Sequence, residues 1–151
     1  MTVAAPTEQL VVRPRRVRRV AAIAAAGVVV VFTVVAVLLR NTPTGVYFHR
    51  SDQVAMVGVG LAIALGILSL ARPRLRADAR GVEVRNIIET KRLPWELVLA
   101  VTFPEGAPWA RLELPDNEYV AVMAIQAADG DHAVRAMREL RRLHRDTTNR
   151  T

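Results

Sequence analysis

Two long apolar runs constrain this chain more than any other feature of its sequence. The first covers residues 20–39 and the second covers residues 54–71, and neither contains a charged side chain. As helices rising about 1.5 Å per residue, they would span roughly 30 and 27 Å, close to the thickness of a bilayer's hydrocarbon core. A helix that is apolar on every side cannot lie on a small soluble domain. We therefore predict a membrane hairpin of two transmembrane helices, joined by an outer loop over residues 40–53.

The first run is also open to interpretation as a cleavable signal peptide. The pairs Arg15-Arg16 and Arg18-Arg19 precede it, as basic residues precede such signals. However, the run is longer than the apolar region of most signal peptides, and no A-x-A cleavage site follows Leu39. These features favour a membrane span.

The distribution of arginine predicts the orientation of the hairpin. Five arginines lie within residues 1–19, before the first run, and the loop between the runs holds only Arg40 and Arg50. After the second run come Arg72, Arg74, Arg76 and Arg80. Because positively charged flanks stay in the cytoplasm, we predict a plasma membrane protein with both termini cytoplasmic. The arginines from Arg13 to Arg19 and from Arg72 to Arg80 form a basic collar at the inner leaflet. The collar residues that could contact anionic lipid are Arg15, Arg16, Arg18, Arg19, Arg72, Arg74 and Arg76.

Small residues recur at four-residue spacing within both runs. They are Ala22 and Ala26 in the first run, and Gly58, Ala62 and Gly66 in the second. Such spacing lets helix backbones approach closely. We expect packing through these positions, first within the hairpin and second between protomers. The alternative is that the spacing has no role in packing, because two alanine-rich segments show it by chance.

Composition excludes several classes of function. The absence of cysteine excludes disulfides, thiolate metal sites and a cysteine nucleophile. The net charge of +7 is concentrated near the ends of the apolar runs and in the C-terminal tail. Because this charge forms no continuous basic surface, we expect no nucleic-acid partner.

Residues 72–146 have the pattern of a small β-rich cytoplasmic domain. Apolar and polar residues alternate around Leu75 and Ala77 and again around Val82 and Val84, with a turn at residues 78–81 between them. Further strands are predicted over residues 87–93, 97–103, 109–114 and 119–123. An amphipathic helix, capped by Asp129 or Asp131, runs to about Arg145. Residues 147–151 are expected to be a flexible tail.

The order of several short segments resembles a known family. Those segments are Arg72-Pro-Arg-Leu75, Gly81-Val-Glu-Val-Arg85, Leu93-Pro-Trp95, Val101-Thr-Phe103, Trp109-Ala-Arg-Leu-Glu-Leu114 and the closing helix. They are similar to bacterial PH-like domains of the low molecular weight protein antigen 6 type, found in small actinobacterial membrane proteins with an N-terminal transmembrane hairpin. The resemblance implies a PH-like domain of two antiparallel sheets with about seven strands, capped by a C-terminal α-helix. It implies no catalytic residues.

No constellation of residues points to catalysis. The three histidines have no metal-ligand spacing, and the two serines lie in the predicted loop and in the second span. Glu113, Asp116 and Glu118 surround one turn and could do acid–base work or hold a cation, although such groups are more often the solvated side of a hairpin. We predict that the protein is not an enzyme and that it has no catalytic residue, cofactor or metal.

The segment between two predicted strands is the candidate for partner binding. It is irregular, braced by prolines and close to two aromatic residues, and it comprises Phe103, Pro104, Glu105, Gly106, Pro108 and Trp109. Trp95 and Trp109 themselves are expected in the core. The sequence thus favours a membrane-tethered scaffolding module that binds a protein partner at the inner face of the plasma membrane. Two alternatives remain, an accessory subunit acting through its hairpin and a module that binds lipid headgroups at the basic collar.

Overall fold

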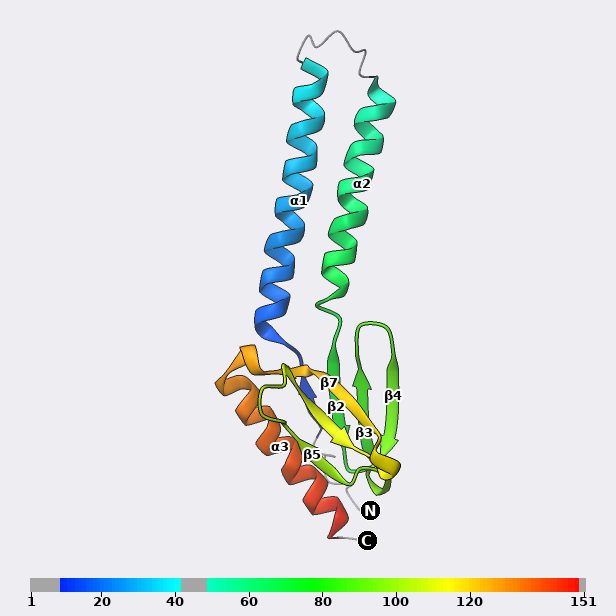
Figure 1. The fold of residues 1–151 in the computed structure, drawn as a ribbon, viewed down its shortest axis with the longest axis vertical. Helices are drawn as coiled ribbons and strands as arrows, with labels where there is room; N and C mark the ends of the chain where they lie inside the picture. The colour runs from blue at the N-terminus through cyan, green and yellow to red at the C-terminus, as the bar shows by residue number, and fades with distance from the viewer. Residues whose placement is uncertain (1–8, 42–48, 150–151) are drawn as a thin grey trace, which may run out of the picture. The chain divides into compact units, whose positions relative to one another are not determined.

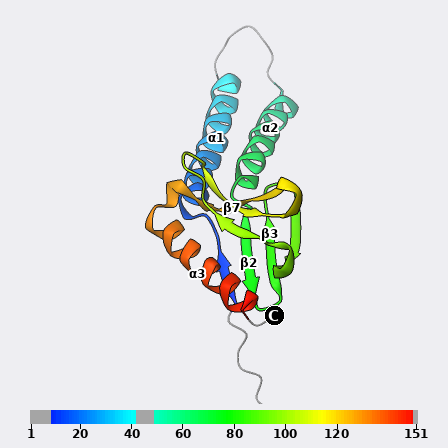
Figure 2. The ribbon, with the colours of Figure 1, turned by 60° about the horizontal axis from the view of Figure 1, so that its bottom comes forward.

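The computed structural model describes residues 9–41 and 49–149. The chain divides into two compact units. Among the described residues, 17–41 and 49–71 form a helical hairpin, and residues 9–16 join residues 72–149 in a β domain with one long helix. Figures 1 and 2 show the elements of both units.

The hairpin consists of α1 (Arg15–Asn41) and α2 (Arg50–Ser69). Both are long and apolar enough to cross a membrane, and only 11% of each apolar window is buried within the protein. The core helix of a soluble protein would be mostly buried, and these two helices are not. The hairpin of two apolar helices is therefore as predicted. Residues 42–48 of the predicted outer loop, including Tyr47 and Phe48, lie outside the described residues.

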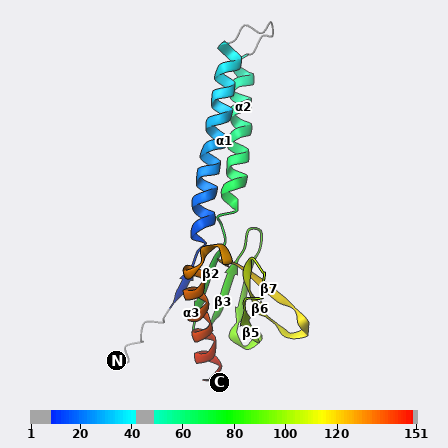
Figure 3. The ribbon, with the colours of Figure 1, turned by 60° about the vertical axis from the view of Figure 1, so that its left-hand side comes forward.

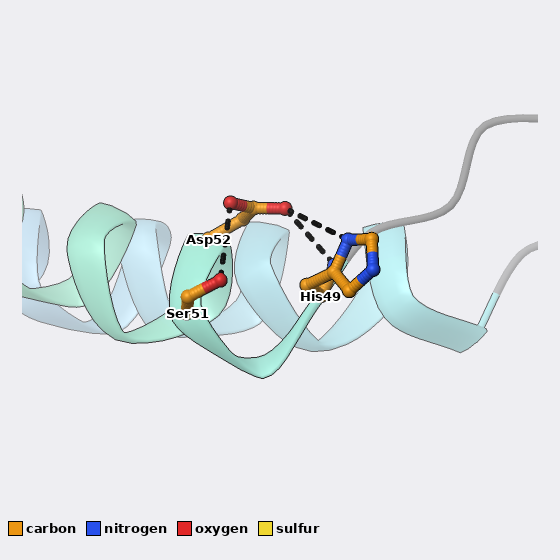
Figure 4. A network of polar contacts seen from close by, with 3 residues as sticks. All are labelled: His49, Ser51 and Asp52. Carbon is orange, nitrogen blue, oxygen red and sulfur yellow. Dashed lines mark hydrogen bonds and ion pairs between the residues drawn. The ribbon is translucent and has the colours of Figure 1, made fainter.

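A local capping arrangement determines where α2 begins. His49 has an extended backbone, and the carboxylate of Asp52 accepts a hydrogen bond from the His49 N–H at 2.9 Å (Figure 4). The second oxygen of Asp52 accepts a hydrogen bond from the Ser51 hydroxyl at 3.5 Å. A carboxylate in the first turn also interacts favourably with the positive end of the helix dipole. The helix therefore starts four residues before the apolar run.

The two helices pack through small residues. Gly60 faces Phe32 so closely that a Cβ at this position would lie 2.7 Å from the Phe32 Cβ. The positions buried in the hairpin are Ala21, Ala25, Ala36, Gly60 and Ala64. The Gly60–Ala64 and Ala21–Ala25 pairs have the spacing that permits close helix approach.

The predicted packing positions within the hairpin are wrong by one or two residues. The small residues named from the sequence are all exposed, namely Ala22, Ala26, Gly58, Ala62 and Gly66. Because each residue turns the helix by about 100°, a shift of one or two positions moves a residue to another face. Four-residue spacing alone does not identify which face is buried.

The β domain contains two antiparallel sheets (Figure 3). The first has the order β1-β2-β3-β4, formed by β1 (Leu10–Val12), β2 (Arg74–Asp78), β3 (Gly81–Arg85) and β4 (Thr90–Pro94). The second has the order β5-β6-β7, formed by β5 (Ala100–Thr102), β6 (Trp109–Glu113) and β7 (Tyr119–Gln126). Single 3₁₀ turns lie between β4 and β5 (η1, Trp95–Leu97), between β6 and β7 (η2, Pro115–Asn117) and between β7 and the last helix (η3, Ala127–Asp129). The last helix is α3 (Asp131–Thr148). The predicted fold class is confirmed.

Alternating residues from both sheets meet α3 in one core. The buried side chains of the sheets include Leu75, Val82, Val84, Leu112 and Val122, and α3 contributes Ala133, Ala136, Met137, Leu140 and Leu143. Antiparallel strands with one buried face show this alternation, and the helix excludes water from the other side of the core.

Strand β1 is an element that the sequence does not predict. It lies within residues 1–19, assigned from the sequence to a basic N-terminal segment, and it pairs antiparallel with β2 so that Val12 is opposite Leu75. Val12 is only 3% exposed, and Pro14 is also buried. Three residues beside an arginine cluster carry too little periodicity to indicate a strand. In chain order, the hairpin is thus inserted between two neighbouring strands.

The start of α1 is bound by a residue near the other end of the chain. The carboxylate of Asp129 accepts hydrogen bonds from the N–H groups of Arg15 and Arg16, both at 2.9 Å. The first turn of α1 contains no acidic residue, so Asp129 supplies the negative charge that a helix N-terminus favours. The prediction that Asp129 or Asp131 caps α3 is wrong, because Gly130 occupies that position with a φ of 52°.

Two predicted strands are shorter than expected. The strand predicted over residues 87–93 begins at Thr90, because Ile87 and Ile88 form the tip of the β3–β4 turn. The strand predicted over residues 97–103 is reduced to β5 because η1 occupies its first residue. In both segments β-branched and apolar residues have high strand propensity, but propensity alone does not form a strand where no partner strand pairs with it.

Helix α3 is longer than predicted. It continues to Thr148, whereas the flexible tail was predicted to begin at residue 147. The Thr147 hydroxyl donates to the Leu143 carbonyl and the Thr148 hydroxyl donates to the His144 carbonyl, both at 2.9 Å. Residues 150–151 lie outside the described residues.

Replacing Val12 tests whether β1 is an integral part of the domain. We expect Val12→Ala to lower the free energy of unfolding by about 2 kcal/mol, because it removes buried methyl groups and leaves a cavity. The measurement is urea unfolding of the detergent-solubilised full chain, followed by tryptophan fluorescence. Val11→Ala is the matched control, since Val11 belongs to the same strand but is 43% exposed. Equal losses in the two variants would show that β1 does not contribute to the core.

Replacing Gly60 tests the packing of the hairpin. We expect Gly60→Ala to destabilise the helix pair by about 1–3 kcal/mol, because the new methyl group overlaps Phe32. Gly58→Ala is the control, since a Cβ at Gly58 meets nothing within 4 Å. The stability is measured by SDS titration in mixed micelles, with energy transfer between probes on α1 and α2 as the signal. A neutral Gly60→Ala variant would contradict this helix interface.

Candidate functional site

The segment predicted to bind a partner connects β5 to β6. A turn closes it, in which the Ala107 N–H donates to the Pro104 carbonyl at 3.1 Å and Gly106 has a φ of 73°. The Pro108 carbonyl accepts from the Ala127 N–H at 3.0 Å, which fixes the end of the segment to the residue after β7. Its side chains do not form one surface, because Phe103 packs against the core whereas Glu105 points to solvent.

Phe103 instead lines a groove beside α3. The groove has a volume of about 370 Å³ and lies between the end of β5, η3 and one flank of α3. Its lining is mainly apolar, formed by Phe103, Ala127, Gly130, Ala133, Val134 and Met137, with Arg138 and Arg141 adding two guanidinium groups. Val134 is 47% exposed although it is apolar. The groove therefore presents apolar surface beside positive charge.

Side chains of α3 fix the wall of this groove to β5. The Nε of Arg141 donates to the Val101 carbonyl at 3.0 Å, and the Nε2 of His144 lies 2.8 Å from the Val98 carbonyl. Val101 belongs to the edge strand β5, and Val98 lies between η1 and β5, so these contacts tie α3 to that strand and to the link before it. These polar contacts hold one wall of the groove in a fixed position.

A second candidate surface lies on the outer face of the four-stranded sheet. Of the predicted basic collar, Arg74 and Arg76 lie on this face of β2, next to β3. Burial is the main cause that lowers the pKa of Arg74, and the charges of Arg76 and Arg13 lower it further. Arg85 is directly opposite Arg74 across the β2–β3 pair. The structure therefore adds Arg85, which the predicted collar omitted.

The remaining collar residues are placed differently. Arg15 and Arg16 are in the first turn of α1 with exposed side chains, and their backbone N–H groups bind Asp129. Arg72 is exposed in the link that precedes β2. Arg18 and Arg19 belong to the helical unit, so no common site with the domain is assigned to them.

Comparison with known proteins identifies the domain. The sequence profile described as "Bacterial PH domain" matches residues 72–143. Uncharacterised proteins of Mycobacterium tuberculosis and Mycobacterium bovis are each 43% identical over 143 residues, which cover 95% of this chain and 93% of the relative. The chain belongs to the bacterial PH domain family. Low molecular weight protein antigen 6 of Mycobacterium tuberculosis is 32% identical over 68 residues, covering 45% of this chain and 60% of that protein. No solved structure matches the chain significantly.

The predicted resemblance to bacterial PH-like domains is therefore confirmed. Most of the residues that carried it lie in the strands and in the helix of the PH domain, and the family profile ends at residue 143, within α3. Strand β1 and the hairpin lie outside the residues matched by the profile, although the mycobacterial relatives match nearly the whole chain.

The acidic turn of the PH domain contains no assembled site. The Glu113 carboxylate accepts a hydrogen bond from the Thr102 hydroxyl at 2.6 Å, whereas Asp116 and Glu118 are exposed around η2. Within residues 9–41 and 49–149, no group of three histidine or carboxylate side chains is arranged to hold a metal ion. Asp116 and Asn117 have φ values near 60°, which a tight turn explains.

The two tryptophans of the PH domain have different environments. Trp95 is 3% exposed, its Nε1 donates to the Asp78 carbonyl at 2.7 Å, and its ring lies 5.5 Å from that of His144. The prediction that Trp95 is in the core is correct. The same prediction for Trp109 is wrong, because Ala110 and Leu112 occupy the inward positions of β6 and leave Trp109 half-buried on the other face.

The environments of the tryptophans predict unequal effects of substitution. We expect Trp95→Phe to cost about 2–3 kcal/mol of stability, because it removes a buried hydrogen bond and leaves a cavity. Trp109→Phe is the matched control and should cost less than about 1 kcal/mol. Urea unfolding followed by circular dichroism measures both. A larger loss for Trp109→Phe would contradict the assigned burial.

Proposed function

We propose that this protein is a membrane-tethered, non-enzymatic binding module that holds a protein partner at the inner face of the plasma membrane. The observation that supports this function is the groove between Phe103 and α3. Ligand pockets commonly occupy about 300–1,000 Å³, and the groove lies in this range. Membership of the PH domain family is consistent with binding rather than catalysis.

The chemistry of the groove indicates what kind of partner it fits. Its apolar lining suits one large apolar side chain, and Arg138 and Arg141 suit carboxylates beside that side chain. The exposed part of α3 extends the positive charge, since α3 holds five arginines against Asp131, Glu139 and Asp146. The proposed occupant is therefore an acidic segment of a partner protein with an apolar anchor residue.

The pairing of β1 with β2 supports the proposed orientation. Two spans return the chain to the side of the membrane from which it left, and only this arrangement lets residues 10–12 pair with residues 75–77. The excess of arginine beside both strands favours the cytoplasm as that side. The same pairing argues against cleavage of α1 as a signal peptide, because cleavage would remove a strand from the sheet.

The hairpin supports a second candidate function, an accessory subunit of a membrane complex. Gly27, Gly58 and Gly66 have open space where a Cβ would lie, so another helix could approach them closely. In this alternative the partner binds the helices rather than the groove. Substitutions of Gly58 and Gly66 with leucine would then abolish assembly and leave the PH domain folded.

Site-specific cross-linking distinguishes these functions. A photoreactive residue at Val134 in the full-length protein should capture a partner in cells, because Val134 lines the groove. A photoreactive residue at Arg135 is the control, since it is exposed on the same helix but outside the groove. The captured segment, mapped by mass spectrometry, should contain an apolar residue flanked by acidic residues. Arg138→Glu should reduce capture at least tenfold, whereas Arg135→Glu should not. Equal capture from both positions, or none from Val134, would contradict the groove as the binding site.

A further inference from the structure

A row of arginines crosses the four-stranded sheet at one end. Arg74 is directly opposite Arg85, and Arg85 is opposite Thr90 on β4. Arg13 follows β1 immediately, and its charge acts on Arg74. We call Arg13, Arg74 and Arg85 the arginine row. Like charges directly opposite each other destabilise a sheet. The arginine row therefore lowers the stability of the domain when nothing is bound to it.

The arginine row has few protein partners. The Nε atoms of Arg74 and Arg85 are buried and have no hydrogen-bond partner among the described residues. Glu83 is the acidic residue whose charge acts on Arg74, but its carboxylate already accepts from the Nε of Arg92 at 2.7 Å. Guanidinium groups in such a setting match the geometry of phosphate oxygens, which they bind in a bidentate manner.

The β3–β4 turn lies just beyond the arginine row. Its tip is Ile87-Ile88, closed by a hydrogen bond from the Asn86 N–H to the Glu89 carbonyl at 2.8 Å. Such tight turns normally hold glycine, asparagine or aspartate. Here Ile88 is 95% exposed, which puts an entire apolar side chain in contact with solvent.

The isoleucine tip is held in place from the second sheet. The Asn86 side-chain amide donates to the Ala121 carbonyl at 2.8 Å, and its oxygen accepts from the Met123 N–H at 3.2 Å. Both partners belong to β7, so Asn86 links the turn to the edge of the three-stranded sheet. The exposure of Ile88 is therefore a property of a fixed turn.

The strand register places the row and the tip at the end of the sheet that leads into the hairpin. β1 runs toward α1, and β2 follows α2. Arg74 is three residues past the end of the second apolar run, so its Cα is within about 11 Å of that end even in a fully extended chain. β3 and β4 are neighbours of β2 at strand spacings of about 5 Å each. Both features therefore lie at the end of the sheet through which the chain enters and leaves the hairpin.

We propose that the arginine row and the Ile87-Ile88 tip together form a lipid-contact surface that docks the PH domain on anionic membrane. The guanidinium groups of Arg74 and Arg85 bind headgroup phosphates, and Ile88 inserts at the boundary between headgroups and acyl chains. Apolar insertion and electrostatic attraction to anionic lipid reinforce each other at an interface. This surface involves neither Phe103 nor α3 and goes beyond the proposed protein-binding groove.

The absence of cysteine makes a direct test practical. The full-length protein with Ile88→Cys is labelled with an environment-sensitive fluorophore and placed in nanodiscs of phosphatidylcholine, or of an equal mixture with phosphatidylglycerol. Lipids with a nitroxide quencher on the acyl chain report insertion. Ala79→Cys is the matched control, because Ala79 is exposed at the β2–β3 turn, at the opposite end of the same sheet. We expect at least twofold stronger quenching at residue 88 than at residue 79 in the anionic discs, and less quenching at residue 88 without phosphatidylglycerol.

Charge variants test the part played by the arginine row. Arg74→Gln with Arg85→Gln should weaken docking about 30-fold, which corresponds to about 1 kcal/mol for each base near an anionic surface. Arg135→Gln with Arg145→Gln removes the same charge from α3 and should leave quenching at residue 88 unchanged. Circular dichroism of each variant verifies that the domain is folded. A separate measurement adds millimolar inorganic phosphate to the unlabelled protein in discs, to test whether the row binds free phosphate instead of lipid headgroups.

Three outcomes would overturn the proposal. The first is equal quenching at residues 88 and 79 in anionic discs. The second is quenching that is insensitive to the Arg74 and Arg85 substitutions in a folded protein. The third is thermal stabilisation by inorganic phosphate, lost on substitution of the row, without any dependence on phosphatidylglycerol. That result would assign the row to a soluble phosphate compound instead of a membrane.

Discussion

The pairing of β1 with β2 is the interaction on which the rest of the structure depends. It places the hairpin, in chain order, between two neighbouring antiparallel strands, where a simple hairpin turn would otherwise connect them. Paired strands are about 5 Å apart, and packed helices are about 8–10 Å apart. The links between strands and helices are short, and each contains a buried proline, Pro14 on one side and Pro73 on the other. A rigid proline in each link limits the conformations available where the chain leaves the sheet. Both links therefore join the hairpin to the same end of the four-stranded sheet.

The features that the sequence predicts are those with a strong periodic signal. Two apolar runs predicted two long helices, and strict alternation identified the inward faces of β2 and β3. The alternation in β6 was also visible, but its inward face was assigned wrongly to Trp109. The failures occur where a tertiary contact overrides a local signal. β1 is too short to show a period, and its stability comes from Val12 in the core. Ile87 and Ile88 have the highest strand propensity of their segment, yet they form a turn that Asn86 holds by hydrogen bonds to residues far away in sequence. Propensity describes one residue, whereas pairing depends on the partner strand.

The candidate site was only partly predictable for the same reason. The irregular segment after β5 drew attention to Phe103, which does line the groove. The other wall is the flank of α3, about 30 residues later, and an amphipathic pattern shows which face of a helix is buried but not which flank remains open. The arginine row was not predicted for the same reason, because it depends on contacts between segments that are far apart in the sequence. Arg13 and Arg85 are far apart in the chain, and only the strand register brings them beside Arg74. A site that requires three strands cannot be located from spacing along one segment.

The proposed membrane anchor affects the roles of both proposed surfaces, the arginine row and the groove beside α3. In the proposed arrangement two spans already anchor the protein, so the arginine row is not needed to bring the domain to the membrane. The proposed docking would instead orient the domain, because contact through the sheet end would restrict the rotation of a domain attached by short links. Restricted rotation reduces the entropy that a partner's binding must overcome. In the proposed arrangement a groove of modest volume would then retain the proposed partner at the membrane, where its effective concentration is high. In this proposed arrangement the lipid composition of the membrane would determine how α3 is presented to a partner, which would couple the two proposed surfaces without any change in the fold.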